Sequence, residues 1–480
     1  MKRDDRLLCG GLFAGVLLAY LGAPSAFYNF DGVACAIAVE LGDLRNLAHG
    51  NHVAYGLVGL AFDRLWRLLG YAGPAILPLD ALSSLLGAAT CAVFASTLRR
   101  AGCARATTLA GALGLAVSQA FWFWHLEAQV YPLGVFFLAL TAREALAERP
   151  RPWLVGLFNA GAVLGHVGHV MFAPAALYLL KRGRSWKRDW VEYAATAAAV
   201  VIAGYALAVV FCLKPRDTQD LRLWLLGSAA LKVDHSVTWY GGWTPASAWE
   251  WAKMSARIFA EPAGTAASKV LGRALALCGI GAAVAGAWLG KERRLVNACL
   301  LWIAAYALLF GSWEPFMPVY RIGDLLALWL LAVLFFKKMP LLLAVYVAAL
   351  CVYNAATEVL PRSQPANNAA YQEALLVGGR TPENACIVVT GMGQVYVPYF
   401  AHRRSLNLRY FESRLDALPS RLEDLRRAGE PAYVTASTLE SGAWRGVLES
   451  YGLTEVARRG DAVLFLLRKT GTRAAAAKRS

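Results

Sequence analysis

Apolar runs recur over the first three quarters of the chain, separated by short polar loops. A helix that crosses a membrane needs roughly 20 apolar residues. The pattern predicts a mainly α-helical, polytopic membrane bundle with about 11 spans. The predicted spans are 7–23, 76–98, 107–124, 130–146, 153–164, 167–180, 193–213, 266–289, 295–310, 322–336 and 341–356.

Two apolar segments need a separate interpretation. Charged residues such as Asp63 interrupt residues 52–69, so we expect an amphipathic helix at the membrane interface there. Residues 153–180 could form one long helix, but the basic clusters at its two ends would then lie on opposite sides of the membrane. Two short helices that meet at residues 166–169 keep both clusters on one side.

Short basic loops between the spans give the orientation, because Lys and Arg are enriched on the cytoplasmic side. We expect a cytoplasmic N-terminus and, after an odd number of spans, an external C-terminal domain. The A-P-S-A of residues 23–26 could be a signal-peptidase site. We expect an uncleaved first span, because the candidate functional residues follow it.

The composition changes after Glu358, which predicts two domains: a transmembrane domain over 1–357 and a soluble α/β domain over 358–480. The second contains short β-branched runs alternating with helical patterns. Strands are predicted at 385–390, 432–436 and 463–467, and helices at 415–427 and 444–451. The G-M-G that follows the first strand is too short for a nucleotide fingerprint.

Composition supports a membrane protein. Hydrophobic residues make up 58% of the chain and charged residues only 17%. This is more hydrophobic and less charged than an ordinary soluble domain. The net charge of +16 would favour nucleic acid in a soluble protein. Here many basic residues lie in loops between spans, so we expect membrane lipids and no nucleic acid as partners. The nine cysteines are scattered and show no metal-ligand spacing.

All seven histidines fall in external loops on this threading, which indicates a polar functional cavity on the outer face. Asp31 follows the first span directly, where the membrane surface would partly desolvate its carboxylate and raise its basicity. It could be a general base toward a hydroxyl, or only the N-cap of a helix that starts at Gly32. His52 could likewise be only part of a polar interfacial turn.

The loop after the third span reads F-W-F-W-H-L-E-A-Q-V-Y. Its Glu127 and Tyr131 are four positions apart and would share one face of a helix. In the G-H-V-G-H turn, His166 and His169 lie at membrane depth, where polar residues usually line a cavity. Two histidines can equally cap and pair at a tight turn.

Arg321 is predicted at the outer end of the span 322–336. Its guanidinium can present two parallel donors to a phosphate. An internal pair with Asp324 would explain this arginine as well.

Taken in order, these motifs resemble the membrane-integral GT-C glycosyltransferases, particularly the branch related to protein O-mannosyltransferases. Asp31-Gly32 resembles the start of that family's first outer loop. Residues 49–55 (H-G-N-H-V-A-Y), 123–131 (F-W-H-L-E-A-Q-V-Y) and 165–169 (G-H-V-G-H) resemble three further family motifs. The chain lacks the family's acidic pair and proline pair, and these departures concern the acceptor more than the fold.

The resemblance implies an inverting transfer of a sugar from a polyprenyl-phosphate donor to a hydroxyl of a protein, lipid or glycan on the external face. Asp31 would be the single base, and Glu127 would orient acceptor or sugar. Some relatives use a divalent metal, but the sequence gives no support for one, so we expect no cofactor. Residue usage favours a bacterial inner membrane. The donor phosphate would be bound by His52, His166, His169, Arg321 and Tyr131.

Two other functions remain open. An envelope polysaccharide polymerase or ligase would also use large outer loops, and the loop 214–262 carries Arg216, Arg222 and His235. A transporter would show an internal repeat and ionisable residues near mid-span. The sequence has no such repeat between its halves, and its charges lie at span ends.

Overall fold

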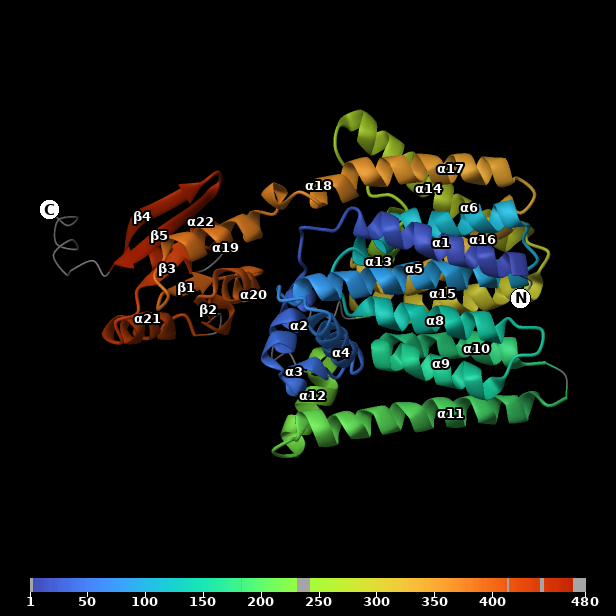
Figure 1. Ribbon diagram of the computed structural model, residues 1–480, viewed down its shortest axis with the longest axis horizontal. Helices are drawn as coiled ribbons and strands as arrows, with labels where there is room; N and C mark the ends of the chain where they lie inside the picture. Colours follow the sequence, from blue (N-terminus) through green and yellow to red (C-terminus); the bar gives the residue numbers. More distant parts are fainter. Residues whose placement is uncertain (1–2, 183, 231–241, 412–413, 441–443, 469–480) are drawn as a thin grey trace. The chain divides into compact units, whose positions relative to one another are not determined.

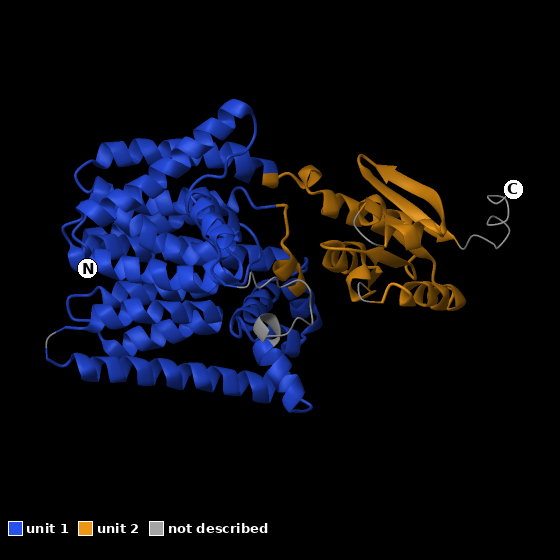
Figure 2. Cartoon of the chain, turned by 180° about the vertical axis from the view of Figure 1, so that it is seen from behind, with its two compact units in different colours: residues 1–25, 35–361 blue, residues 26–34, 362–480 orange. Residues whose placement is uncertain are grey.

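The computed structural model describes residues 3–182, 184–230, 242–411, 414–440 and 444–468. The chain divides into two compact units, which Figure 2 distinguishes by colour. Unit 1 consists of residues 1–25 and 35–361, and unit 2 of residues 26–34 and 362–480. The sequence did not suggest that residues 26–34 group with the C-terminal part.

In the described part of unit 1 the secondary structure is helical (Figure 1). The α-helices are α1 (Arg3–Leu21), α2 (Phe30–Leu41, which begins in unit 2), α3 (Leu44–Leu47), α4 (Tyr55–Leu68), α5 (Ile76–Arg100), α6 (Arg105–Val117), α7 (Gln119–Trp124), α8 (Tyr131–Ala145), α9 (Pro152–Gly165), α10 (Ala173–Leu180), α11 (Trp186–Leu207), α12 (Thr218–Ala230), α13 (Pro245–Arg257), α14 (Ala266–Leu289), α15 (Arg293–Trp313), α16 (Ile322–Phe336), α17 (Pro340–Asn354) and α18 (Leu360–Arg362, which ends in unit 2). Shorter turns of 3-10 or π type are η1 (Val167–Phe172), η2 (Ala208–Leu213), η3 (Pro318–Arg321) and η4 (Ala355–Val359).

Six helices among the described residues are long and apolar enough to cross a membrane. They are Ile76–Arg100, Trp186–Leu213, Ala266–Leu289, Arg293–Trp313, Pro318–Phe336 and Pro340–Arg362. Three shorter apolar helices, Arg105–Val117, Pro152–Gly165 and Val167–Leu180, add to these. The polytopic helical architecture is therefore as predicted, whereas the number of 11 spans is not confirmed.

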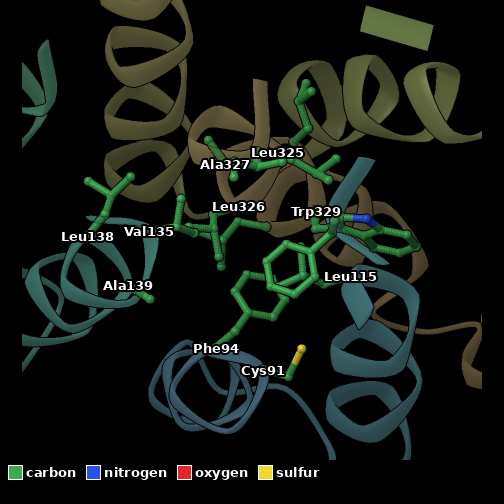
Figure 3. Close-up of a cluster of buried hydrophobic side chains, with 14 of the residues drawn as sticks. Cys91, Phe94, Leu115, Val135, Leu138, Ala139, Leu325, Leu326, Ala327 and Trp329 are labelled. Carbon is green, nitrogen blue, oxygen red and sulfur yellow. The ribbon is translucent and has the colours of Figure 1, made fainter. Parts of the chain in front are cut away.

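α16 forms the centre of the unit 1 core. Nearly all of its residues are buried, as expected for a helix that is apolar on every side. Figure 3 shows its Leu326 and Trp329 among side chains of neighbouring helices, including Phe94 of α5, Leu115 of α6 and Val135 of α8.

Close backbone approach between α14 and α16 gives a stability prediction. A Cβ built on Gly286 would lie 1.8 Å from the Leu331 carbonyl oxygen, so alanine there must push the two helices apart. We expect Gly286→Ala to lower the free energy of unfolding by about 1–3 kcal/mol, measured as thermal unfolding of the detergent-solubilised protein. Gly281→Ala, on the same helix with no atom within 4 Å, is the matched control. Equal stability of the two variants would contradict this account.

The predicted span 107–124 is interrupted at Ser118, where the backbone is extended. The N–H groups of Gln119 and Ala120 donate to the carbonyls of Phe259 and Ile258, at 3.0 and 3.1 Å. These two N–H groups therefore bond to the segment after α13 instead of to α6, and the chain continues as a separate helix, α7. The prediction of a single helix over residues 107–124 was wrong, because tertiary hydrogen bonds replace the helical ones at this point.

The other two boundary decisions agree with the structure. Residues 152–180 form two short helices, α9 and α10, joined by η1, and the break falls at the extended residue His166. Residues 55–68 form the amphipathic helix α4, whose Gly56, Gly59 and Asp63 are buried. Asp63 is held there by Arg67 one turn later, at 2.7 Å.

Unit 2 contains a five-stranded sheet of order β2-β1-β3-β5-β4. Its strands are β1 (Cys386–Val389), β2 (Arg404–Asn407), β3 (Ala432–Thr435), β4 (Gly452–Arg459) and β5 (Ala462–Arg468). Its helical elements are η5 (Pro365–Asn367), α19 (Ala369–Arg380), α20 (Gly393–Tyr396), η6 (Val397–Ala401), η7 (Leu408–Phe411), α21 (Ala417–Arg427), α22 (Ala436–Glu440) and α23 (Arg445–Glu449). β1 runs parallel to β2 and β3, and the other pairs are antiparallel. The three predicted strands are present, while the polar edge strands β2 and β4 were missed.

Candidate functional site

Two short turns of unit 1 bring four histidines together. The turn between α3 and α4 carries His49 and His52, whose rings stack at 4.5 Å. The turn between α9 and α10 carries His166 and His169, with ring centroids 5.8 Å apart. Backbone bonds join the turns: Ala54 N–H donates to Leu164 at 2.9 Å, and Val167 N–H donates to Asn51 at 2.8 Å. We call these four residues the histidine cluster.

Tyrosines pack against the histidine cluster. Tyr131, at the start of α8, lies 4.8 Å from the His166 ring. Tyr320 meets Tyr131 edge-on at 5.5 Å and lies 6.0 Å from His166. The Tyr306 hydroxyl lies 2.6 Å from Nδ1 of His169. The cluster is therefore a polar site among aromatic rings, with His166 and His169 buried and His49 and His52 half-buried. Such a site suits a ligand that combines a charged group with an apolar chain.

The hydrogen bonds of the rings determine which nitrogens can meet a ligand. Nδ1 of His166 accepts from Gly168 N–H at 3.2 Å, and Nδ1 of His49 accepts from Asn51 N–H at 3.2 Å. In the neutral rings, Nε2 therefore carries the proton. Nδ1 of His52 and Nε2 of His169 are buried without a hydrogen-bond partner among the described residues. A buried unpaired nitrogen is costly, and a bound ligand could satisfy it.

Burial determines the protonation state of the two histidines in the turn between α3 and α4. It lowers the pKa of His49 and lowers the pKa of His52 well below its usual range, where His49 and His166 add repulsion. Both rings are therefore neutral at pH 7 when no anion is present. A bound phosphate would favour the protonated form and reverse this shift.

Glu127 and Tyr131 do not lie on one helix, so the predicted shared face is wrong. α7 ends at Trp124 and α8 begins at Tyr131. Side chains of α5 accept hydrogen bonds from the backbone between these two helices. Asp80 Oδ1 accepts from Ala128 N–H at 2.5 Å, and Ser83 Oγ accepts from Gln129 N–H at 3.3 Å. Glu127 is almost fully buried.

Glu127 accepts a hydrogen bond from Ser25 Oγ at 3.1 Å. Ser25 follows the end of α1, so the carboxylate is tied to the first segment of the chain. The buried Asp80 lies close enough for electrostatic repulsion between the two acids. Two acidic side chains thus meet beside the segment that leads into Tyr131.

The structure tests the N-cap interpretation of Asp31. α2 begins at Phe30, and the Asn29 side chain accepts from Gly32 N–H at 2.9 Å. Asn29 is therefore the capping residue, and the N-cap interpretation of Asp31 is wrong. Asp31 is exposed at the surface, yet desolvation by surrounding protein atoms raises the pKa of its carboxyl. Its role as a base stays a prediction.

Arg321 forms the internal pair that was its alternative interpretation. It is 1% exposed, and its Nη2 donates to Asp324 at 2.8 Å. Nη1 donates to the Ser255 hydroxyl at 3.1 Å and to the Trp251 carbonyl at 3.3 Å. The guanidinium also stacks over the Trp251 ring at 3.4 Å. These contacts fix η3, which carries the neighbouring Tyr320.

Besides Tyr306, sequence reasoning missed three residues near this site. Asp80 was hidden inside a predicted span, although an acid within an apolar run is itself a signal. Tyr320 precedes Arg321 in V-Y-R, and a single tyrosine near a predicted span end carries no specific signal. Tyr55 adds a buried hydroxyl next to Asp80 and Ser83. His235 lies outside the described residues.

No group of three or more metal-ligating side chains with suitable geometry is found in the part of the chain that the structure describes. The expected lack of a metal cofactor stays a prediction.

Residues 55–149 match the family model described as the N-terminal domain of protein O-mannosyl-transferase TMEM260. This segment runs from α4 to the loop after α8 and contains Glu127 and Tyr131. The expected resemblance to GT-C glycosyltransferases is confirmed.

Solved structures agree with the family model at the level of fold. ArnT from Cupriavidus metallidurans bound to undecaprenyl phosphate superimposes with a TM-score of 0.64 at 11% identity, covering 97% of this chain and 98% of that one. Its apo form gives the same TM-score and identity, over 96% and 97% of the two chains. The arabinofuranosyltransferase AftD from Mycobacteria gives 0.54 at 14% identity, over 98% of this chain and 40% of AftD. A search of curated proteins finds no match.

These similarities and the apolar helices identify an integral, multi-pass membrane protein with a GT-C-like fold.

Proposed function

We propose that this protein is an inverting glycosyltransferase that moves a sugar from a polyprenyl-phosphate donor to a hydroxyl acceptor on the external face of a bacterial inner membrane. The observation that carries the proposal is the histidine cluster, in which buried ring nitrogens of His52 and His169 have no hydrogen-bond partner among the described residues and tyrosines pack alongside. It is supported by a fold shared with a protein that binds undecaprenyl phosphate. In this proposal the N-terminus is cytoplasmic and unit 2 is external.

In the proposed reaction Asp31 accepts the proton of the acceptor hydroxyl. The hydroxyl oxygen attacks the anomeric carbon on the face opposite the phosphate, and the bond between that carbon and the phosphate oxygen breaks. The configuration at the anomeric carbon is inverted. A phosphate leaves as a stable anion, so no second carboxylic acid is needed to protonate it, in contrast to glycoside hydrolysis. Glu127 orients the acceptor or the sugar.

The leaving phosphate is bound by the histidine cluster in this proposal. His52, His166 and His169 supply ring N–H donors, and Tyr131 adds a hydroxyl. Direct contact with Arg321 stays a prediction, because its guanidinium already bonds to Asp324, Ser255 and Trp251. Its structural effect is to hold Tyr320 against Tyr131.

The proposal is tested by incubating the purified protein in lipid nanodiscs with a panel of polyprenyl-phosphate sugars. We expect release of polyprenyl phosphate from at least one donor, measured by chromatography. No release of polyprenyl phosphate from any donor in the panel would contradict the proposal. Chain extension of a lipid-linked glycan, or solute uptake into liposomes, would instead support the polymerase or transporter function.

The histidine cluster gives a separate kinetic prediction. We expect His166→Gln to raise the KM for the donor about tenfold or more, because it replaces a ring donor that faces a charged phosphate. The value of kcat should change less than the KM does. His125→Gln is the matched control, because His125 is also buried and bonds to the Phe121 carbonyl at 2.6 Å, outside the cluster. An equal KM for wild type and His166→Gln would remove this ring from phosphate binding.

A further inference from the structure

Unit 2 contains a topological switch point. β1 lies between β2 and β3 and runs parallel to both. After β1 the chain packs on one face of the sheet, where Val397 and Ala401 join the core with Leu376 of α19. After β3 it packs on the opposite face, where Trp444 and Leu448 join the second core. Chains that leave neighbouring parallel strands toward opposite faces open a crevice at the carboxyl ends of the strands.

A cavity of about 100 Å³ occupies this crevice. Its walls come from α19 and from the carboxyl ends of β1 and β3 with the residues that follow them. Gly391, two residues after the end of β1, has φ +51 and permits the sharp turn away from the strand. The polar lining residues are Glu373, Thr390, Thr435, Ser437 and Thr438.

The polar groups are linked by hydrogen bonds. Ser437 Oγ donates to Glu373 at 2.8 Å. Thr435 Oγ1 lies 3.1 Å from Ser437 Oγ and 3.2 Å from Thr438 Oγ1. Burial raises the pKa of the Glu373 carboxyl, while the hydroxyl bonds oppose this shift. The cavity therefore holds one partly desolvated carboxylate within a row of hydroxyls.

This lining favours one class of ligand. Among the described lining residues there is no Lys, Arg or His, so a phosphate or nucleotide would meet a carboxylate without a counter-charge. An ammonium group only donates hydrogen bonds, so its best site would contain acceptors alone. Most polar groups here are hydroxyls, which both donate and accept. The vicinal hydroxyls of a sugar also both donate and accept. The apolar remainder of the wall, Ala370, Ala374 and Val389 among it, can cover the C–H face of a ring.

We propose that this cavity binds one neutral sugar ring, with Glu373 accepting hydrogen bonds from a pair of sugar hydroxyls and Ser437 and Thr435 completing the network. The site is distinct from the histidine cluster, and sugar binding there does not require that unit 1 be a transferase. It makes unit 2 a carbohydrate-binding module.

The proposal is tested on the full chain in nanodiscs by titration with glucose, mannose, galactose, arabinose and their methyl glycosides, followed by saturation-transfer NMR. We expect saturable binding of at least one sugar by wild type. Glu373→Gln should weaken it about tenfold or more, because the charged acceptor is lost. Ser437→Ala, at an exposed position where folding is not at risk, should weaken it less. Glu383→Gln, an exposed glutamate of the same unit, is the matched control and should bind as wild type does.

Three results would overturn the proposal: no sugar bound by wild type at tens of millimolar, equal binding by wild type and Glu373→Gln, or binding of ethanolamine in preference to every sugar. Release of polyprenyl phosphate is measured on the same samples. Glu373→Gln should retain this release, so failure of the sugar site and failure of the proposed transferase activity are distinguishable.

Discussion

Replacing Asp31 by Asn should lower turnover of the polyprenyl-phosphate donor by about 10²–10⁴-fold, the usual contribution of a general base. Asparagine keeps the size of the side chain but cannot accept the acceptor's proton at neutral pH. The Asn29 cap is untouched, so α2 should still form. The measurement is the initial rate of polyprenyl-phosphate release at saturating donor, where kcat should fall while the donor KM changes little.

Asp416→Asn is the control for this substitution. Asp416 is exposed, precedes α21 and makes no side-chain cap bond, so its loss should leave the rate unchanged. If Asp31→Asn and wild type released polyprenyl phosphate equally fast, Asp31 could not be the base, and Glu127 would become the stronger candidate.

The pH profile provides a second measurement on the same residue. A base must be deprotonated to act, so activity falls as the pH drops through its pKa. Because desolvation raises the pKa of Asp31, this acid limb should lie above the usual aspartate value of about 4. An acid limb at or below that value would contradict the raised pKa.

Much of the fold could be predicted because its elements are defined by local pattern. Long apolar runs predicted most of the helices of unit 1, and short apolar runs predicted β1, β3 and β5. The errors occur where distant groups take over the backbone. At Ser118 the carbonyls of Phe259 and Ile258 replace the helical partners, and no local pattern contains them. β2 and β4 were missed because edge strands can be polar on both faces.

The candidate site was predictable in its residue types but not in its connections. The turns H-G-N-H and G-H-V-G-H could be identified separately in the sequence, but their backbone bonds to each other are a tertiary fact. For Glu127 and Tyr131 the helical spacing misled, because Asp80 and Ser83 of a different helix bind the backbone between them. For Arg321 the sequence offered two partners, and burial against Trp251 and Asp324 shows that the internal one is occupied.

Replacing Arg321 by Ala should destabilise unit 1 by about 3–5 kcal/mol, because the fully buried Asp324 would lose its counter-charge. The expected result is a marked drop in the thermal unfolding midpoint and in the yield of folded protein. Arg321→Lys should recover only part of the loss, because an ammonium cannot reproduce the paired bonds of the guanidinium to Asp324. Arg257→Ala provides the comparison, because its pair with Glu261 is partly exposed and should contribute about 1 kcal/mol or less.

The double variant Arg321→Met with Asp324→Leu separates the structural role of Arg321 from a role in phosphate binding. Removing both charges and filling the space with apolar side chains should restore most of the stability. If Arg321 only holds Tyr320 in place, the double variant should also keep a donor KM close to that of wild type. A donor KM raised tenfold or more in this stable background would instead establish that the guanidinium contacts the phosphate, which would require it to exchange bonds with Asp324 and Ser255 when the donor binds. Full stability of the single Arg321→Ala variant would contradict the buried ion pair itself.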